Sequence, residues 1–465
     1  MTVTIHLFRD DLRLDDNPAL AQAAEAGAVV PLYVLDEDSP GAFAPGGASK
    51  WWLHHSLMAL DESLEKLGSR LIIRQGKTAD AARDVAEDTG ADAVTLTRGY
   101  APWHVRNERR LQDVLGTEDI ALRRYGGSLL FEPEAVATKS GDPYKVFTPF
   151  WRACLEQDAP GRPKPAPSKL ATPDNWPDGL ALDDLKLLPT KPDWSGGLEE
   201  NWNPGEDGAA ENLERFLDEA AADYSNNRDV PGERGTSRLS PHLRFGEISP
   251  RRIWQTVRNA KGRTKGAEAF LREVGWREFC QHLLFHFPDM MTASLREEFE
   301  DVPWSRDSKH LESWQKGQTG YPIVDAGMRE LWHTGWMHNR VRMVAASFLI
   351  KHLLVDWRTG ADWFWDTLVD ADPGNNAAGW QWVAGCGTDA APYFRVFNPV
   401  LQGEKFDTGG SYVRHWVPEV ADLPDNVVHK PWEAENPPKD YPAPIVEHKR
   451  ARERALEAYK AVKKD

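Results

Sequence analysis

The segment TGWMHNRVRM, residues 334–343, places an amide, a thioether and two guanidinium groups between apolar residues. If the segment is helical, Asn339 and Met343 lie four residues apart on one face, and Arg342 is adjacent to them. An amide can donate to and accept from the edge of a planar heteroaromatic ligand, while a polarisable sulfur packs on its face. A structural role is the alternative, because an Asn–Arg pair in a helix can also cap it or bridge to a neighbour. The spacing alone leaves both interpretations open.

A second segment, LREVGWREF at residues 271–279, combines a carboxylate and an indole in the same way. Glu273 and Trp276 are three residues apart and would share a helical face, with Arg277 one turn from Glu273. This segment could therefore offer a hydrogen-bond acceptor and a flat apolar surface to one ligand.

Two further segments combine polar groups with a chain break or an expected helix start. DADPGNNAAGWQW, residues 370–382, has alternate aspartates, a Pro–Gly break, and Trp380 and Trp382 two residues apart, which a helix would point to different sides. GERGTSRLS, residues 232–240, supplies hydroxyls and backbone N–H groups that could cradle a phosphate. For the second segment taken alone, an ordinary N-cap is the favoured interpretation.

The elements that must position these residues fall into distinct zones. Residues 1–135 alternate β-rich runs such as TIHLFR and VVPLYVL with helical stretches, which predicts a Rossmann-like α/β domain with a parallel sheet, although no GxGxxG follows the first strand. Residues 136–210 predict an interdomain connection, because nine Pro lie between 160 and 205. Apolar spacing over residues 211–440 predicts an all-α domain, and residues 441–465 predict a final exposed helix.

The charge balance limits which ligands the protein can bind. Its 56 Lys and Arg against 72 Asp and Glu give a net charge of −16, which repels nucleic acid unless basic residues are concentrated locally. Such a concentration occurs between residues 224 and 279, with 12 Lys and Arg against 6 Asp and Glu. A solvated surface face is the alternative interpretation, and a phosphate-binding surface is the functional one.

Cysteine usage and the chain start indicate an intracellular protein. Cys154, Cys280 and Cys386 lie too far apart in sequence for a disulfide framework or a CxxC metal pair, so we expect a reducing cytoplasm and no metal site. The start MTVTIHLFRDDLRL lacks a secretory signal, and the apolar run at 344–355 is too short to span a bilayer. We therefore expect no membrane segment.

Five longer sequence segments, spread along most of the chain, can be compared with known protein families. They are LFRDDLRLDDNPAL at 7–20, PYKVFTPFWR at 143–152, TSRLSPHLRFGEISPR at 236–251, GYPIVDAGMREL at 320–331 and APYFRVFNP at 391–399. Together they resemble, in the same order, sequences of the photolyase/cryptochrome family of flavoproteins. The resemblance implies an antenna-binding α/β domain, a long linker and a helical catalytic domain that binds FAD.

The resemblance also implies a reaction. In family members that act on cyclobutane pyrimidine dimers, the lesion meets residues that match Glu273, Trp276, Asn339, Met343 and Trp382, and all five types are present here. Arg228 and Arg340 match positions that would hold flanking phosphates of UV-damaged DNA. Light-dependent splitting of these dimers is therefore the favoured function, in the class III branch rather than class I. The alternative is a cryptochrome-type blue-light photoreceptor without repair activity.

Cofactor positions follow from the same resemblance. The FAD phosphates would be held by Tyr224, Thr236, Ser237, Arg238, Leu239 and Ser240. The positions implied near its ring system are Arg342, Asp370, Asp372 and Asn376, the last opposite the flavin N5, and Arg277 is a further implied cofactor contact. Trp304, Trp357 and Trp380 match a chain of indoles that restores reduced flavin under light.

The antenna chromophore is less specified than FAD. In VRNERR, Asn107 and Glu108 resemble residues that hold a folate in some family members. We expect 5,10-methenyltetrahydrofolate, with 8-hydroxy-deazaflavin as the alternative, and a monomeric protein.

Overall fold

The computed structural model describes residues 2–390 and 395–462, and the chain forms two compact units. The first unit comprises Met1–Tyr144, Thr148–Asp218 and Ser237–Pro288, and the second comprises Lys145–Phe147, Glu219–Thr236 and Asp289–Asp465. Part of the family-like segment at 391–399 and the last three residues of the expected tail lie outside the described residues.

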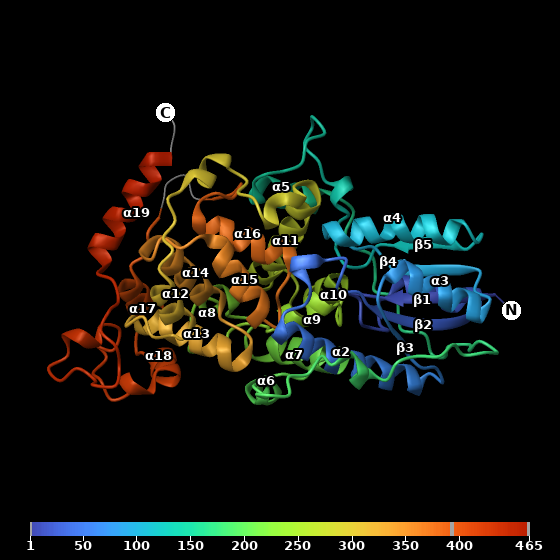
Figure 1. The fold of residues 1–465 in the computed structure, drawn as a ribbon, viewed down its shortest axis with the longest axis horizontal. Coiled ribbons are helices and arrows are strands. Elements are labelled where there is room, and N and C mark those ends of the chain that lie inside the picture. Colours follow the sequence, from blue (N-terminus) through green and yellow to red (C-terminus); the bar gives the residue numbers. More distant parts are fainter. Residues whose placement is uncertain (1, 391–394, 463–465) are drawn as a thin grey trace. The chain divides into compact units, whose positions relative to one another are not determined.

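The first unit contains a five-stranded parallel sheet in the order β3-β2-β1-β4-β5 (Figure 1). The strands are β1 (Val3–Phe8), β2 (Ala28–Leu35), β3 (Ile72–Gln75), β4 (Ala93–Thr97) and β5 (Ala121–Tyr125). Every residue of β2 and β4 is buried, as expected for strands covered on both faces. The predicted parallel α/β fold is confirmed.

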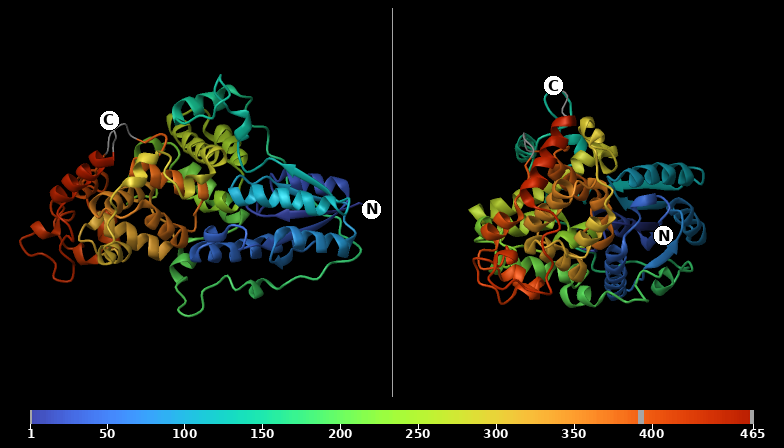
Figure 2. Two further views of the ribbon diagram at one scale, coloured as in Figure 1. Left: turned by 45° about the horizontal axis from the view of Figure 1, so that its top comes forward. Right: turned by 60° about the vertical axis from the view of Figure 1, so that its left-hand side comes forward.

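Helices cover both faces of this sheet (Figure 2). They are α1 (Pro18–Ala26), α2 (Gly47–Lys66), α3 (Thr78–Thr89) and α4 (Pro102–Gly116). Helices α3 and α4 pack together and bury one side of the central strands, where Ile5, Leu32 and Leu96 belong to the same apolar core as Leu111. Asn17 fixes the start of α1, because its side chain accepts a hydrogen bond from the N–H of Leu20 at 3.0 Å.

Further helices complete the first unit. They are α5 (Phe147–Glu156), α6 (Gly196–Asn201), α7 (Glu206–Glu219), α9 (Ser240–Phe245), α10 (Pro250–Lys261) and α11 (Lys265–His286). The first residue of α5, Phe147, and the last residue of α7, Glu219, belong to the second unit. Thr264 caps α11 by accepting from the N–H of Ala267 at 3.4 Å. Helix α11 carries Glu273 and Trp276, so a single rigid element positions both.

The second unit is helical, as the apolar spacing predicted, and its described residues contain no strand. Its helices are α8 (Tyr224–Asn227), α12 (Ser308–Gln315), α13 (Pro322–Thr334), α14 (Asn339–Ser347), the π-helix η6 (Phe348–His352), α15 (Trp357–Thr367), α16 (Pro373–Ala384), α17 (Pro399–Phe406), α18 (Ser411–Trp416) and α19 (His448–Val462). Across residues 2–390 and 395–462, none of the helices combines the length and the apolar character needed to cross a membrane.

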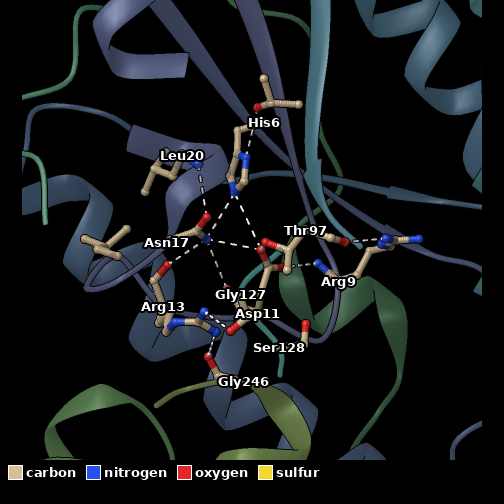
Figure 3. Close-up of polar contacts among 12 residues, drawn as sticks. His6, Arg9, Asp11, Arg13, Asn17, Leu20, Thr97, Gly127, Ser128 and Gly246 are labelled. Atoms are coloured by element: carbon tan, nitrogen blue, oxygen red, sulfur yellow. Dashed lines mark hydrogen bonds and ion pairs between the residues drawn. The ribbon is translucent and has the colours of Figure 1, made fainter. Parts of the chain in front are cut away.

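A buried arginine joins three distant parts of the first unit (Figure 3). The guanidinium of Arg13 donates to the carbonyl oxygens of Asp16 and Gly127, each at 3.1 Å, and of Gly246 at 2.8 Å. Arg13 is 1% exposed, so these carbonyls have little access to water that could replace it. The loop after β1, the segment after β5 and the end of α9 therefore share one donor.

We expect Arg13→Met to destabilise the first unit by about 3 kcal/mol or more, since several buried carbonyl groups lose their donor. Urea unfolding followed by tryptophan fluorescence would measure the change. The matched control is Arg123→Met on the exposed edge strand β5, which should unfold at the parent's urea concentration. Equal stability of the two variants would contradict this role.

Candidate functional site

An ion pair joins α14 to the start of α16 in the second unit. The Nη2 of Arg342 lies 2.8 Å from Oδ2 of Asp370, and its Nε donates to the carbonyl of Met337 at 2.7 Å. Asp370 is buried, and its Oδ1 has no hydrogen-bond partner among residues 2–390 and 395–462. Because a buried oxygen without a donor is costly, the arrangement fits a bound group that supplies one.

Two other predicted cofactor residues lie at the start of α16. Asp372 caps the helix by accepting from the N–H of Asn375 at 2.7 Å, and Asn376 donates from its amide to the carbonyl of Ala361 in α15 at 3.1 Å. Asp370, Asp372 and Asn376 therefore follow one another along a short stretch that the Arg342 ion pair holds in place. A polar ligand edge could find both charge and hydrogen-bonding groups here.

The start of α14 is set by an unusual cap. The Nδ1 of His338 accepts from the N–H of Arg340 at 3.2 Å, and burial lowers the pKa of His338 to about 4, so the ring is neutral and can accept. Helix α14 begins at Asn339, which is exposed, and Met343 lies one turn later, half-buried. The two side chains thus occupy the same face at the edge of the unit.

Both arginines expected to grip phosphates lie beside one carboxylate. Arg340 lies 2.8 Å from Asp229, and Arg228 lies 4.0 Å from the other oxygen of the same residue. Aromatic rings support both cations, with Phe406 4.4 Å below Arg340 and Tyr224 5.6 Å below Arg228. The second unit therefore presents two guanidinium groups close together.

The three indoles of the expected photoreduction chain all belong to the second unit. Trp380 and Trp357 are 3% and 1% exposed, whereas Trp304 is half-buried. Trp380 packs on Phe364 with ring centroids 5.0 Å apart, and Arg358 lies 4.9 Å over the Trp357 ring. Among the described residues, the indole N–H groups of Trp304 and Trp357 have no acceptor.

Close packing fixes Trp380. A Cβ atom at Gly360 would lie 2.1 Å from its ring, so only glycine allows α15 to approach this indole. Trp382, two residues later on α16, is half-buried and turned to another side of the helix.

Helix α11 of the first unit carries the other predicted lesion contacts. Glu273 and Trp276 are both half-buried and share a helical face. Arg277 donates to the carbonyl of Ser128 at 2.9 Å and lies 3.4 Å from Glu278. In the first unit, this guanidinium thus ties α11 to the loop after β5.

Glu278 strengthens the same anchor. Its Oε2 accepts from the N–H groups of Leu130 at 2.7 Å and Phe131 at 3.2 Å. Burial raises the pKa of Glu278 to about 7, although Arg277 and the two N–H groups favour the charged form. The side chain therefore titrates near neutral pH.

The expected phosphate cradle is divided between the units. Thr236 belongs to the second unit, like Tyr224, whereas Ser237, Arg238, Leu239 and Ser240 belong to the first. Helix α9 starts at Ser240, as the GERGTSRLS segment predicted, and the hydroxyl of Ser237 accepts from the N–H of Leu239 at 3.3 Å. Arg238 has a left-handed backbone, with φ of 54°, and its guanidinium lies 5.7 Å over the ring of Trp202.

The two expected antenna residues both lie on α4 and already have partners. Glu108 is buried, lies 2.7 Å from Arg9 and accepts from the N–H of Gly99 at 3.0 Å. Asn107 accepts from the hydroxyl of Ser39 at 3.0 Å and donates to Asp36 at 3.3 Å.

A buried polar network lies beside them at the carboxyl ends of β1 and β4 (Figure 3). Asp11 accepts from the hydroxyl of Thr97 at 2.6 Å and from the amide of Asn17 at 3.1 Å, and Asn17 also lies 3.3 Å from Nε2 of His6. In doubly wound sheets this edge, where the strand order reverses, is the usual ligand site. Here the chain's own side chains bond to one another at that edge.

Comparison with known proteins identifies the family. Residues 4–168 match the model for DNA photolyase, and residues 270–461 match the FAD binding domain of DNA photolyase. The deoxyribodipyrimidine photo-lyase of Agrobacterium fabrum is 50% identical over 98% of this chain and 97% of its own length. Cryptochrome-2 of Arabidopsis thaliana is 38% identical over 93% of this chain and 73% of its own length.

Solved structures agree with the sequence comparison. The crystal structure of a bacterial class III photolyase from Agrobacterium tumefaciens matches with a TM-score of 0.96 and 49% identity, covering 100% of this chain and 98% of the other. An archaeal photolyase from Sulfolobus tokodaii, crystallised with two FAD molecules, matches with a TM-score of 0.84 and 30% identity, covering 99% of this chain and 100% of the other. The chain belongs to the photolyase/cryptochrome family, as the resemblance predicted.

Sequence reasoning missed three residues of this site. Asp229, which holds two arginines, and Glu278, which anchors α11, act through partners that no spacing rule reveals. His338 lies inside the MHNR motif, but its role as the N-cap depends on α14 beginning at the next residue, Asn339. The motif alone does not fix that starting point. The only sequence signal for Asp229 was its position next to Arg228.

We expect Glu278→Gln to change how stability depends on pH. The native pKa of about 7 lies above the usual 4.5, so the folded protein binds this proton more tightly than the unfolded chain does. The stabilisation is present below pH 4.5 and is lost as the pH rises through 7. Relative to the parent, the variant should gain about 3 kcal/mol over this range, because it cannot titrate.

Urea unfolding at a series of pH values between 4.5 and 8 would measure the difference. Glu298→Gln, at an exposed position, is the control and should follow the parent. Parallel stability curves for the parent and Glu278→Gln would contradict the raised pKa.

Proposed function

We propose that the protein is a deoxyribodipyrimidine photo-lyase, which uses light and reduced FAD to split cyclobutane pyrimidine dimers in DNA. The observation that carries the proposal is the 50% identity, over 98% of the chain, to a protein of that name. The match to a class III photolyase structure supports that branch over class I. We further propose that it acts as a monomer in the cytoplasm.

The residues around Arg342 fit FAD. Bound reduced FAD would supply the single electron that opens the cyclobutane ring after light absorption, and the electron would then return. The unpartnered Oδ1 of Asp370 would accept a hydrogen bond from the cofactor's polar edge, and Asp372 would add a second acceptor. The Arg342 guanidinium would favour negative charge on the bound cofactor. The amide of Asn376, unlike a carboxylic acid, would not release a proton to the cofactor. Tyr224, Thr236, Ser237, Arg238, Leu239 and Ser240 would hold the phosphates, and Arg277 would be a further cofactor contact.

Five side chains would receive the lesion. A dimer inside a duplex is out of reach, so it must be extruded, and a poorly stacked lesion costs least to extrude. Glu273 and Asn339 would bond the polar edges of the linked pyrimidines and orient them. Trp276, Trp382 and Met343 would cover their flat faces and exclude water.

Phosphate binding would come from the paired arginines. Arg228 and Arg340 present guanidinium groups that can bond phosphate oxygens without reading base sequence. Asp229 holds Arg340 in advance and lies near Arg228, which reduces the entropy lost when DNA binds. This local charge would overcome the repulsion expected from a molecule of net charge −16.

Trp380, Trp357 and Trp304 would pass electrons inward, from an external thiol reductant to the cofactor. The indole N–H groups of Trp357 and Trp304 have no acceptor in the described part of the chain. After it gives up an electron, an indole without an acceptor would keep its N–H proton. Its positive charge could then pass to the next indole toward the surface.

For the antenna we propose 5,10-methenyltetrahydrofolate, with 8-hydroxy-deazaflavin as the alternative. Asn107 and Glu108 on α4 would contact it. Glu108 is tied to Arg9 and Gly99, so its role would be to shape the site, while the less buried Asn107 would be the better direct contact.

We expect Glu273→Gln to retain FAD and to slow light-driven dimer splitting about tenfold or more, because a charged acceptor at the lesion is removed. The assay follows the rise in absorbance of restored thymines in an oligonucleotide with one dimer. Glu298→Gln is the matched control at an exposed position. Dimer splitting at the parent's rate in Glu273→Gln would show that Glu273 does not contribute to splitting. Equal affinity of the parent for damaged and intact DNA would instead favour the cryptochrome-type alternative.

We expect Trp380→Phe to lose light-driven reduction of oxidised flavin, because phenylalanine is too hard to oxidise. The flavin absorption spectrum under blue light with a thiol reductant measures the rate. Chemical reduction by dithionite should bypass the defect, which distinguishes a blocked electron path from a missing cofactor. An unchanged photoreduction rate would exclude Trp380 from the chain of indoles.

A further inference from the structure

The basic residues concentrated between 224 and 279 do not share one role. Six of the twelve pair with carboxylates in the structure: Arg228 with Asp229, Arg244 with Asp10, Arg251 with Asp16, Arg252 with Asp15, Arg258 with Glu268, and Arg277 with Glu278. Three of these carboxylates come from the loop after β1, outside the segment. Half of the basic residues in this segment are therefore neutralised by carboxylates of the protein itself.

Three of the remaining cations lie at the turn between α10 and α11. Lys261, Arg263 and Lys265 form this basic turn, and residues 250–265 contain no Asp or Glu. Arg263 and Lys265 are exposed, and Lys261 is half-buried. Within the described ranges 2–390 and 395–462, none of the three makes an ion pair. The basic turn is thus a concentration of positive charge on the surface of an acidic protein.

Helix α11 links the basic turn to the residues proposed to meet the lesion. Lys265, Arg272 and Trp276 are separated by seven and four residues, so they form one stripe along the helix, and Lys265 and Arg272 are exposed. Eleven residues of α-helix place Lys265 about 16 Å from Trp276 along the axis. A DNA strand advances about 3.4 Å per base pair, so this separation corresponds to about five base pairs.

Building on the proposed function, we infer that the basic turn binds backbone phosphates of the DNA about five base pairs from the lesion. The basic turn would add cations of the first unit to those that Arg228 and Arg340 contribute from the second unit. Lysine and arginine on an exposed turn suit this role, because phosphate binding fixes position without reading sequence. Each neutralised phosphate releases counterions, so the contribution depends on salt and on duplex length.

The test is a variant with Lys261→Gln, Arg263→Gln and Lys265→Gln together. Its affinity is measured by fluorescence anisotropy, in the dark, for duplexes with a central thymine dimer and flanks of about three or about ten base pairs. With long flanks, the slope of log Kd against log salt should fall by about 2.7, or about 0.9 for each phosphate that is no longer neutralised. With short flanks, the variant and the parent should bind alike.

A matched control separates local phosphate binding from overall charge. Lys449→Gln, Arg450→Gln and Arg452→Gln remove the same charge from exposed positions on α19 and should keep the parent's slope on long duplexes. An unchanged slope for the basic-turn variant, or an equal decrease in the α19 variant, would overturn the inference. The proposed function is tested separately, by whether the parent prefers the short damaged duplex to the same duplex without damage.

Discussion

The ion pair between Arg342 and Asp370 is the constraint on which the helical unit's site depends. It joins α14 to the start of α16, and these two helices carry Asn339, Met343, Asn376 and Trp382, which are proposed to meet the lesion or the cofactor. Removing one partner of a buried pair leaves an uncompensated charge, which costs more than the pair itself contributes. The second oxygen of Asp370 remains for a ligand, so the same carboxylate can hold the helices and bind the cofactor.

Internal ion pairs also decide which of the basic residues can bind DNA. The loop after β1 supplies Asp10, Asp15 and Asp16, which neutralise arginines of α9 and α10. Cations used in this way stabilise the first unit and are not available to DNA. A net negative protein can therefore bind a polyanion only where arginines and lysines lack such partners or, as with Asp229, share a single carboxylate.

The sequence was sufficient for the fold class and for short-range geometry. Alternating β-rich and helical segments predicted the parallel sheet, and four-residue spacing predicted that Asn339 and Met343 lie one turn apart. Long-range partners could not be predicted in this way. Nothing near Arg277 indicates the carbonyl of Ser128, and nothing near Arg340 indicates the ring of Phe406, because each partner lies far away in sequence. The start of α14 likewise depends on the protonation state of His338, which burial decides.

Helix α14 directs its two arginines to different surroundings, which would let it serve the two proposed ligands without competition. Arg340 and Arg342 are two residues apart, so the 3.6-residue period turns them about 200° from each other. Arg340 consequently reaches Asp229 and Phe406, while Arg342 reaches Asp370. A strand would place both on one face, and a spacing of three or four residues would do the same in a helix. The segment HNRVRM therefore fits a site in which phosphates and a cofactor are bound from different sides of the same short helix.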